Sequence, residues 1–392
     1  MANPTDTAAA QQLARLESYL LQDPDNLRLL ADLADGYLRA ARWSDARQVL
    51  ARTLAAQPAD PVARYRMAVV ERVGGDAGVA LDLLQGLHRD GVSDPAVLQE
   101  LALVQATRGE WPAVADALAP IEVATLPAAQ GDDVWLLRVR ALHHTGQLDE
   151  AAAEGQAWMA ARGPALPLTA AGALATLFLD CSRLDLLEQV STAAGAAAAS
   201  NAELLTANGY LHLGTGQTDL AAQQFARGVD LSPRLGRAHL GVGLAAAMRG
   251  DVAAAVAALE HTTEVMPEHL GSWHALAWMH LLKRDLVAAR RVFDTALEKD
   301  HNFGDTHGGL ALVTALSGER TQALEHLRVA RRLDPRSMNA AIAGLVLDRR
   351  TDLSDPDLLR DGLRQILRTA AIADSPAAPM IERLAEALTR RH

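Results

Sequence analysis

Hydrophobic and polar residues follow the period of an α-helix over most of this chain, and residues 270–303 show the pattern best. In the first half of that stretch, buried-type residues recur at i, i+3, i+4 and i+7, which is one face of a helix: Trp273, Leu276, Ala277 and His280. Polar residues 283–285 interrupt the pattern, and a second helical face follows with Ala289, Phe293 and Ala296. The stretch therefore predicts a helical hairpin, in which the small residues let the two helices approach closely.

The same features recur every 34 residues from about Asn201 to Ser337, without slippage. Independent helices would not stay in phase over four units, so the period indicates stacked copies of one hairpin. A single hairpin cannot bury its apolar face, and stacking supplies the missing partner. The columns are Pro233, Pro267, His301 and Pro335; Gly209, Gly243, Ala277 and Ala311; Ala221, Ala255, Ala289 and Ala323; and Phe225, Leu259, Phe293 and Leu327.

The order of small, small, bulky and proline columns resembles the tetratricopeptide repeat, of the bacterial type, over roughly residues 27–337. The residues that carry the resemblance best are Trp273, Leu276, Ala277, Ala289, Phe293 and Ala296, followed in sister units by Pro233, Pro267 and Pro335. The resemblance implies an all-α solenoid, a right-handed superhelix of about nine helical hairpins with capping helices at both ends. It also implies a concave groove lined by the first helix of each hairpin, and protein or peptide partners.

Irregularities divide the repeat array. The phase slips between Ile121 and Asp133, and a fifth unit carries Leu187 where a small residue is expected and Ser191 where a bulky one is expected. We therefore expect a change of curvature or a hinge near residues 120–200. The predicted segments are an N-terminal capping helix at 1–26, N-terminal repeats at 27–131, degenerate middle repeats at 132–201, regular repeats at 202–337 and C-terminal capping helices at 338–392.

The C-terminal segment should be polar on its outer side if it caps the array. Arg360, Arg364 and Arg368 recur at i and i+4, opposite the predicted apolar face of that helix. A solvated arginine face is the plainer interpretation, and docking of an acidic partner is the alternative.

Composition narrows the classes of partner. The formal net charge of −11 disfavours a nucleic-acid backbone, which requires clustered Lys and Arg. The single cysteine, Cys181, excludes an intramolecular disulfide and a cysteine-based zinc site. The chain has neither a signal-peptide pattern at its start nor an apolar run of about 18 residues, so we expect a cytoplasmic protein without a membrane span.

The first helices of the last four units should offer an apolar groove, whereas those of the first units should be polar. The groove residues expected from the family geometry are Tyr210, Leu213, Leu240, Leu244, Met248, His274, Trp278, Leu281, Leu282 and Leu312. The polar set is Arg28, Asp32, Asp35, Arg39, Tyr65, Arg66, Arg72, Gln99 and Glu100. An apolar trough with a charged rim suits an amphipathic helix or an extended apolar peptide. The alternative is that these residues pack against neighbouring units or against a terminal helix folded into the groove.

Motifs for chemistry are weak. His239 and His307 occupy the column of Trp273, which favours a packing role with a polar tip over metal binding. The glycine-rich stretches at 214–216 and 241–243 do not follow a strand, and no hydrolase or kinase signature occurs, so we predict neither cofactor nor catalysis.

The function predicted from the sequence is a non-enzymatic scaffold, adaptor or chaperone that holds a protein segment in its groove, with a role in secretion or surface-structure assembly as one setting. A regulatory subunit of a separate enzyme, such as a glycosyltransferase, is the alternative. The terminal helices also leave open a homo-oligomer.

Overall fold

The computed structural model describes residues 4–163, 166–348 and 361–366, and these residues form helices joined by short turns, without a strand among them. The all-α prediction is confirmed: α1 is followed by nine consecutive helical hairpins, from the pair α2–α3 to the pair α18–α19, and then by α20. The described part of the chain contains no helix with both the length and the apolarity that a membrane span requires. The chain divides into two compact units, Met1–Ala157 and Trp158–His392.

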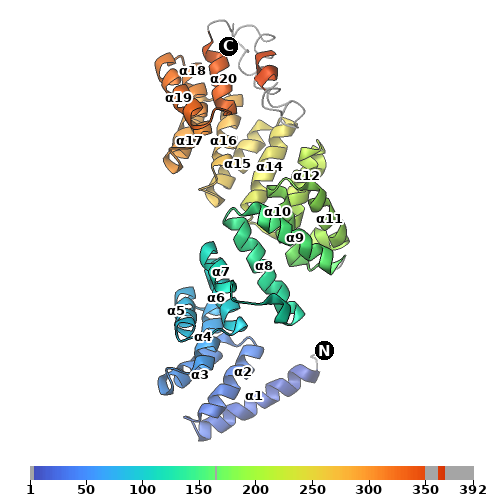
Figure 1. Ribbon diagram of the computed structural model, residues 1–392, viewed down its shortest axis with the longest axis vertical. Helices are drawn as coiled ribbons and strands as arrows, with labels where there is room; N and C mark the ends of the chain where they lie inside the picture. The colour runs from blue at the N-terminus through green and yellow to red at the C-terminus, as the bar shows by residue number, and fades with distance from the viewer. Residues whose placement is uncertain (1–3, 164–165, 349–360, 367–392) are drawn as a thin grey trace. The chain divides into compact units, whose positions relative to one another are not determined.

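The first unit builds up hairpin by hairpin from the N-terminal helix, and each helix from α1 to α7 packs against the next (Figure 1). The long helix α1 lies where the N-terminal capping helix is predicted. The last helix of the series, α9, continues past the boundary of the unit. The elements are α1 (Pro4–Gln22), α2 (Leu27–Arg39), α3 (Trp43–Ala56), α4 (Pro61–Gly74), α5 (Ala77–Arg89), α6 (Pro95–Thr107), α7 (Trp111–Leu118), η1 (Val123–Thr125), α8 (Ala128–His144) and α9 (Leu148–Arg162).

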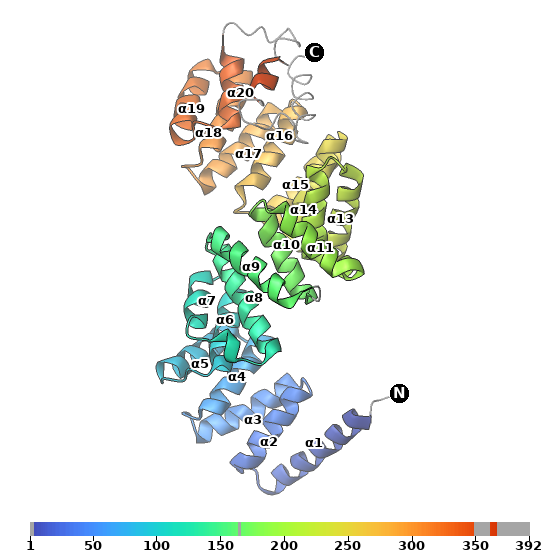
Figure 2. The same cartoon turned by 45° about the vertical axis from the view of Figure 1, so that its right-hand side comes forward.

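The second unit contains the regular repeats, and their antiparallel pairs are visible in Figure 2. The alanine run near residue 195 forms a short 3-10 helix rather than a continuation of α11, because Gly195 adopts a positive φ of 51° at that point. The elements are α10 (Leu168–Asp180), α11 (Leu184–Ala194), η2 (Gly195–Ser200), α12 (Ala202–Gly214), α13 (Thr218–Leu231), α14 (Gly236–Arg249), α15 (Val252–Val265), α16 (Leu270–Leu282), α17 (Leu286–Lys299), α18 (Gly304–Leu316), α19 (Arg320–Leu333) and α20 (Met338–Leu347).

Side chains before the helices fix where several of them begin. The Asp60 carboxylate accepts hydrogen bonds from the backbone N–H groups of Val62 (2.9 Å) and Ala63 (3.3 Å), and Pro61 follows as the first helical residue of α4. Asp94 caps α6 in the same way, again with a proline after it. These Asp-Pro pairs set the helix starts of the first unit locally.

The tight turn inside most hairpins needs one residue with a left-handed backbone. In the regular repeats this position recurs every 34 residues as Gly216, Gly250, Arg284 and Gly318, with φ between 60° and 85°. Glycine adopts this conformation without strain, whereas Arg284 does so at a cost. The turn residue is thus a further column of the repeat.

The core of each hairpin is organised around the bulky residue of the second helix. Phe225 of α13 lies between Gly209 of its own first helix and Gly241 of the next one, and a Cβ atom on either glycine would come within 2.5 Å of the phenyl ring. Phe293 approaches Gly309 of α18 equally closely. The predicted small and bulky columns therefore interlock, and a third small column was missed from the sequence: Gly241, Ala275, Gly309 and Ala343.

The C-terminal segment shows only part of what was predicted. α20 packs mainly against α18, and residues 361–366 add Leu363 to the same core. Arg364 lies 3.6 Å from the carboxylate of Asp361 on its own helical turn. The predicted helix to Arg390, and the residues Arg360 and Arg368, lie outside the described residues.

The interlocking core predicts a specific rescue. Gly241→Ala should destabilise the protein by about 1–3 kcal/mol, because the new methyl group would overlap the ring of Phe225. Adding Phe225→Leu should recover most of that loss, since the smaller side chain recreates the Leu259 and Ala275 pair of the next repeat. Urea unfolding of the single and double variants measures both effects.

Gly214→Ala serves as the control, because nothing lies within 4 Å of its added methyl group. It should leave stability unchanged or raise it. Equal behaviour of the Gly241 and Gly214 variants would contradict the interlocking core.

Candidate partner-binding groove

The residues predicted to line the groove lie on the first helices of four successive hairpins. Tyr210 and Leu213 are on α12, and Leu312 is on α18. The residues on the two helices between them are Leu240, Leu244 and Met248 on α14, and His274, Trp278, Leu281 and Leu282 on α16.

Burial separates these residues into two groups. Leu281 is 1% exposed and Leu312 is fully buried, and Leu213 and His274 are also buried. These four side chains belong to the interior in the present structure, so they would contact a partner only after a rearrangement. Tyr210, Leu240, Leu244, Met248, Trp278 and Leu282 are half-buried.

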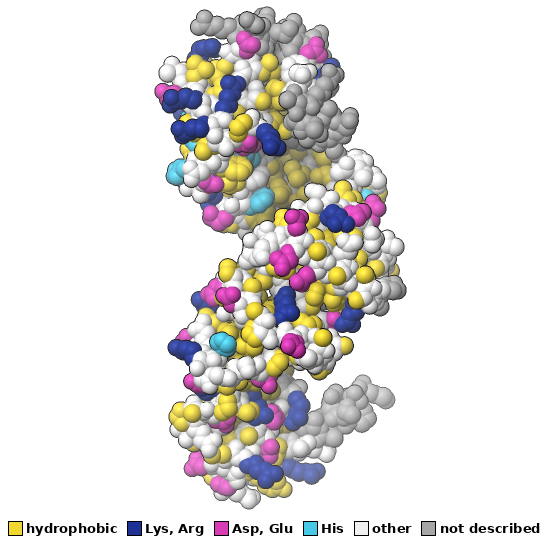
Figure 3. Space-filling view, in the orientation of Figure 1, with side chains coloured by type: hydrophobic (Ala, Val, Ile, Leu, Met, Phe, Trp, Pro, Cys, Tyr) yellow, Lys and Arg dark blue, Asp and Glu magenta, His cyan; other side chains and the backbone are white. Residues whose placement is uncertain are grey.

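Most of the half-buried residues lie on three successive first helices. Leu240, Leu244 and Met248 recur at i, i+4 and i+8 on α14, so they share one face of that helix. We call these three residues, together with Tyr210 and Trp278 on the adjoining first helices, the groove strip. Figure 3 shows hydrophobic side chains gathered in a recess over this part of the molecule. The strip contains the partly exposed members of the predicted groove set other than Leu282, and its role as a binding surface stays a prediction.

Polar contacts hold the Tyr210 end of the groove strip. The Tyr210 hydroxyl donates a hydrogen bond to the backbone carbonyl of Arg237 on α14, at 2.9 Å. The guanidinium of Arg237 forms an ion pair with the carboxylate of Asp180 on α10. This contact links α14 to α10. Burial raises the pKa of the Tyr210 phenol far above its ordinary value, so the hydroxyl stays protonated and available as a donor.

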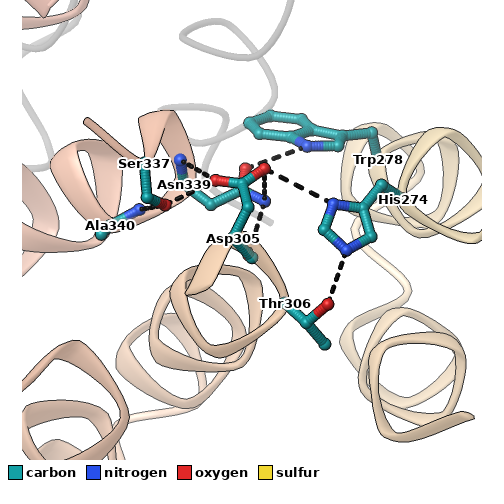
Figure 4. Close-up of polar contacts among 7 residues, drawn as sticks. All are labelled: His274, Trp278, Asp305, Thr306, Ser337, Asn339 and Ala340. Carbon is teal, nitrogen blue, oxygen red and sulfur yellow. Dashed lines mark hydrogen bonds and ion pairs between the residues drawn. The ribbon is translucent and has the colours of Figure 1, made fainter. Parts of the chain in front are cut away.

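Asn339 holds the Trp278 end of the groove strip (Figure 4). The indole N–H of Trp278 donates to the Asn339 side-chain oxygen at 3.1 Å, and the Asn339 amide donates to the Asp305 backbone carbonyl and carboxylate, each at 3.1 Å. Asn339 is 1% exposed, and these bonds satisfy its oxygen and its amide group. Asn339 of α20 therefore fixes the orientation of the Trp278 indole on α16.

Asp305 is the centre of that network, which joins the last two hairpins and α20. Its carboxylate accepts hydrogen bonds from the Ser337 hydroxyl and from the Asn339 backbone N–H, and it lies 3.5 Å from Nδ1 of His274. Burial alone would raise the pKa of Asp305, but the hydrogen bonds from His274, Ser337 and Asn339 outweigh it and hold the pKa below its ordinary value. Asp305 is therefore ionised and acts as the acceptor that ties α16, α18 and α20 together.

The same cluster places a carboxylate, an imidazole and a hydroxyl in series. Nε2 of His274 lies 2.8 Å from the Thr306 hydroxyl, while Nδ1 faces Asp305. This order resembles that of a hydrolytic triad. The Thr306 side chain is fully buried, however, so no substrate can reach it. The series holds helices together and does not form an active site.

The histidine column has the packing role predicted for it. Nε2 of His239 lies 2.9 Å from the carbonyl of Pro233, and Nε2 of His307 lies 3.0 Å from the carbonyl of His301. Trp273, in the same column, donates from its indole to the Pro267 carbonyl at 2.8 Å. Each ring therefore offers an N–H to the carbonyl six residues earlier, in the turn between hairpins.

The polar first helices of the first unit pair mostly with one another. Arg66 lies 2.5 Å from Asp35, and Gln130 donates to Gln99 at 3.2 Å. Arg72 forms an ion pair with Glu100, whose carboxylate is largely buried. Much of this predicted surface thus links neighbouring hairpins.

A cleft between α1 and α2 was not predicted. It has a volume of about 800 Å³, and both helices contribute polar side chains to it, among them Glu17, Asp32 and Arg39. The Tyr37 hydroxyl donates to Glu17 at 2.9 Å, and burial with this contact raises the pKa of Tyr37 to about 12. The amphipathic pattern of α1 indicated a packed capping helix, and it contained no signal for a gap beside α2.

Two stretches of the chain match a known family of repeats. Residues 5–69 match a family model of the tetratricopeptide repeat, and residues 206–262 match a second model of the same repeat. The first match runs from α1 into α4, and the second covers α13 and α14 and parts of α12 and α15. A search among curated proteins finds no match.

The Asp305 network predicts a pH-dependent loss of stability. Asp305→Asn should lower the free energy of unfolding by about 1–3 kcal/mol at pH 7, because several donors lose a charged acceptor. The folded-state pKa of Asp305 is depressed, so its contribution is complete above the unfolded pKa of about 3.9 and is lost as the pH falls through the lower folded value. Denaturation at a series of pH values should therefore show the two proteins converging in acid.

Glu298→Gln is the matched control, because Glu298 is an exposed carboxylate on α17 with no hydrogen bond among the described contacts. It should change stability little at any pH. A constant difference between the Asp305 variant and the wild type down to strong acid would exclude ionised Asp305 as the source.

Proposed function

We propose that this chain, two stretches of which match the tetratricopeptide repeat, is a non-enzymatic scaffold, adaptor or chaperone that binds a protein segment along the groove strip. One observation carries the proposal: five mostly apolar side chains on three successive first helices stay half-buried, so part of their surface is open to a partner. Repeats of this kind are protein-interaction modules, and their presence supports a protein partner.

The chemistry of the groove strip defines the segment that fits. Leucine and methionine side chains offer adaptable apolar contacts, and Trp278 adds a large flat surface whose orientation Asn339 fixes. An amphipathic helix, or an extended peptide with alternating apolar residues, can place anchors on such a surface. Binding would bury the remaining exposed area of these residues and leave the polar face of the segment in water.

We also propose that the protein is cytoplasmic and acts in protein export or in the assembly of a surface structure, as its sequence suggests. An enzyme found as the bound partner would instead support the role of a regulatory subunit.

Site-specific cross-linking tests the groove strip directly. A photo-reactive amino acid at position 244 should capture the partner segment, whereas the same group at position 220 should not. Leu220 is an exposed leucine on the second helix α13, away from the first-helix surface. Mass spectrometry of the adduct identifies the segment that is bound.

Leu244→Asp should then weaken binding of that segment by about tenfold or more, because a charge would be buried against apolar groups. Leu220→Asp is the control with the same chemical change and should bind normally. Retained affinity in a folded Leu244→Asp protein would remove the groove strip from the binding site.

A further inference from the structure

An unpaired arginine face lies on α19, the second helix of the last hairpin. Arg328, Arg331 and Arg332 fall within an arc of about 100° on this helix, and Arg336 follows just after its end. All four side chains are exposed, and Leu324, which is 47% exposed, lies on the same face. Figure 3 shows basic side chains gathered over the α18–α19 part of the molecule. We call these four arginines the α19 arginine face.

Two of these arginines occupy repeat positions that carry acidic residues in preceding repeats. Where α19 carries Arg332, the three preceding repeats carry acidic residues at the same place: Asp230, Glu264 and Glu298. Where it carries Arg328, the two preceding repeats carry Glu260 and Asp294. The chain as a whole has a net charge of −11, so this concentration of positive charge opposes the general composition.

Several arginines elsewhere in the repeats pair with carboxylates of the following hairpin. Arg47 of α3 pairs with Glu71 of the following hairpin at 2.7 Å, and Arg290 of α17 pairs with Glu319 at 3.0 Å. The α19 arginine face has no ion pair with any residue that the structure describes. Arg331 lies over α20 beside Gly344, where that helix offers no acidic side chain.

We propose that the α19 arginine face binds an acidic protein segment that also carries apolar side chains. Carboxylates would supply the counter-charges that neighbouring repeats supply elsewhere, and guanidinium groups bind carboxylates with two parallel hydrogen bonds. The exposed Leu324, one helical turn before Arg328, favours a protein segment over a nucleic acid, whose affinity depends on many phosphate contacts along an extended basic surface. This site is separate from the groove strip.

The positions of Arg331 and Arg332 also suit the negative end of the α19 dipole. That effect acts on the stability of the helix and predicts no ligand. Measurements of binding therefore distinguish the two roles.

Fluorescence anisotropy with a labelled helical peptide of glutamates and leucines tests the proposal. The full chain should bind this peptide, and the binding should weaken with added salt because the contacts are between exposed charges. Arg328→Glu with Arg332→Glu, which restores the acidic residues of the earlier repeats, should weaken binding by about tenfold or more. Arg234→Glu with Arg249→Glu is the control, since it makes the same change in charge at two other exposed arginines.

Each other outcome counts against the proposal. Equal affinity of the two double variants would show that general charge, and not this face, attracts the peptide. Tighter binding of a labelled single-stranded RNA would assign the face to nucleic acid. A dimer in light scattering that the Arg328 and Arg332 changes dissociate would assign it to a second copy.

If the double reversal fails to fold, Arg328→Gln with Arg332→Gln replaces it. Leu244→Asp should bind the acidic peptide normally, so failure here is distinct from failure of the groove strip.

Discussion

The regular repeats depend on one steric constraint, which is that a bulky side chain from each second helix must fit against the neighbouring first helices. Phe225 fills the space that Gly209 and Gly241 leave open, so the two first helices on either side approach it to within contact distance. Close packing of this kind is what stability in a stacked repeat array comes from, because a hairpin alone leaves its apolar face in water. The first helices are therefore held in fixed spacing, and the side chains they present on their other face form an ordered surface.

Buried polar groups decide how far that surface extends. The Asp305 network binds α20 against α18, and Leu312 is enclosed in the same region. The accessible apolar strip consequently ends at Trp278, whose indole is fixed by Asn339. At the other end, the contacts of Tyr210 and Arg237 join α12, α14 and α10. Specific hydrogen bonds thus define the limits of a surface whose middle is apolar.

Local features of the fold could be predicted from the sequence, whereas long-range ones could not. The hairpins follow from helical periodicity, and the interlocking columns follow from a strict 34-residue period. The burial of Leu312 could not be seen, because its helix α18 packs against α20, which follows the end of the period. The bond from Trp278 to Asn339 joins residues 61 positions apart, and no spacing rule anticipates it. The column of Gly241, Ala275, Gly309 and Ala343 was present in the sequence but becomes meaningful only beside the phenyl rings.

Glycine and alanine alternate in that column, so the regular repeats also have a period of two hairpins, or 68 residues. A phenylalanine on a second helix faces a glycine on the next first helix, and a leucine at the same position is matched by an alanine. Adjacent hairpins are therefore not interchangeable. Loss of one hairpin, residues 236–269, would set Phe225 against Ala275, whereas loss of two, residues 236–303, would set it against Gly309. Recombination between repeats would therefore be tolerated in steps of two hairpins. A length change in such an array is constrained by side-chain volume as well as by repeat boundaries.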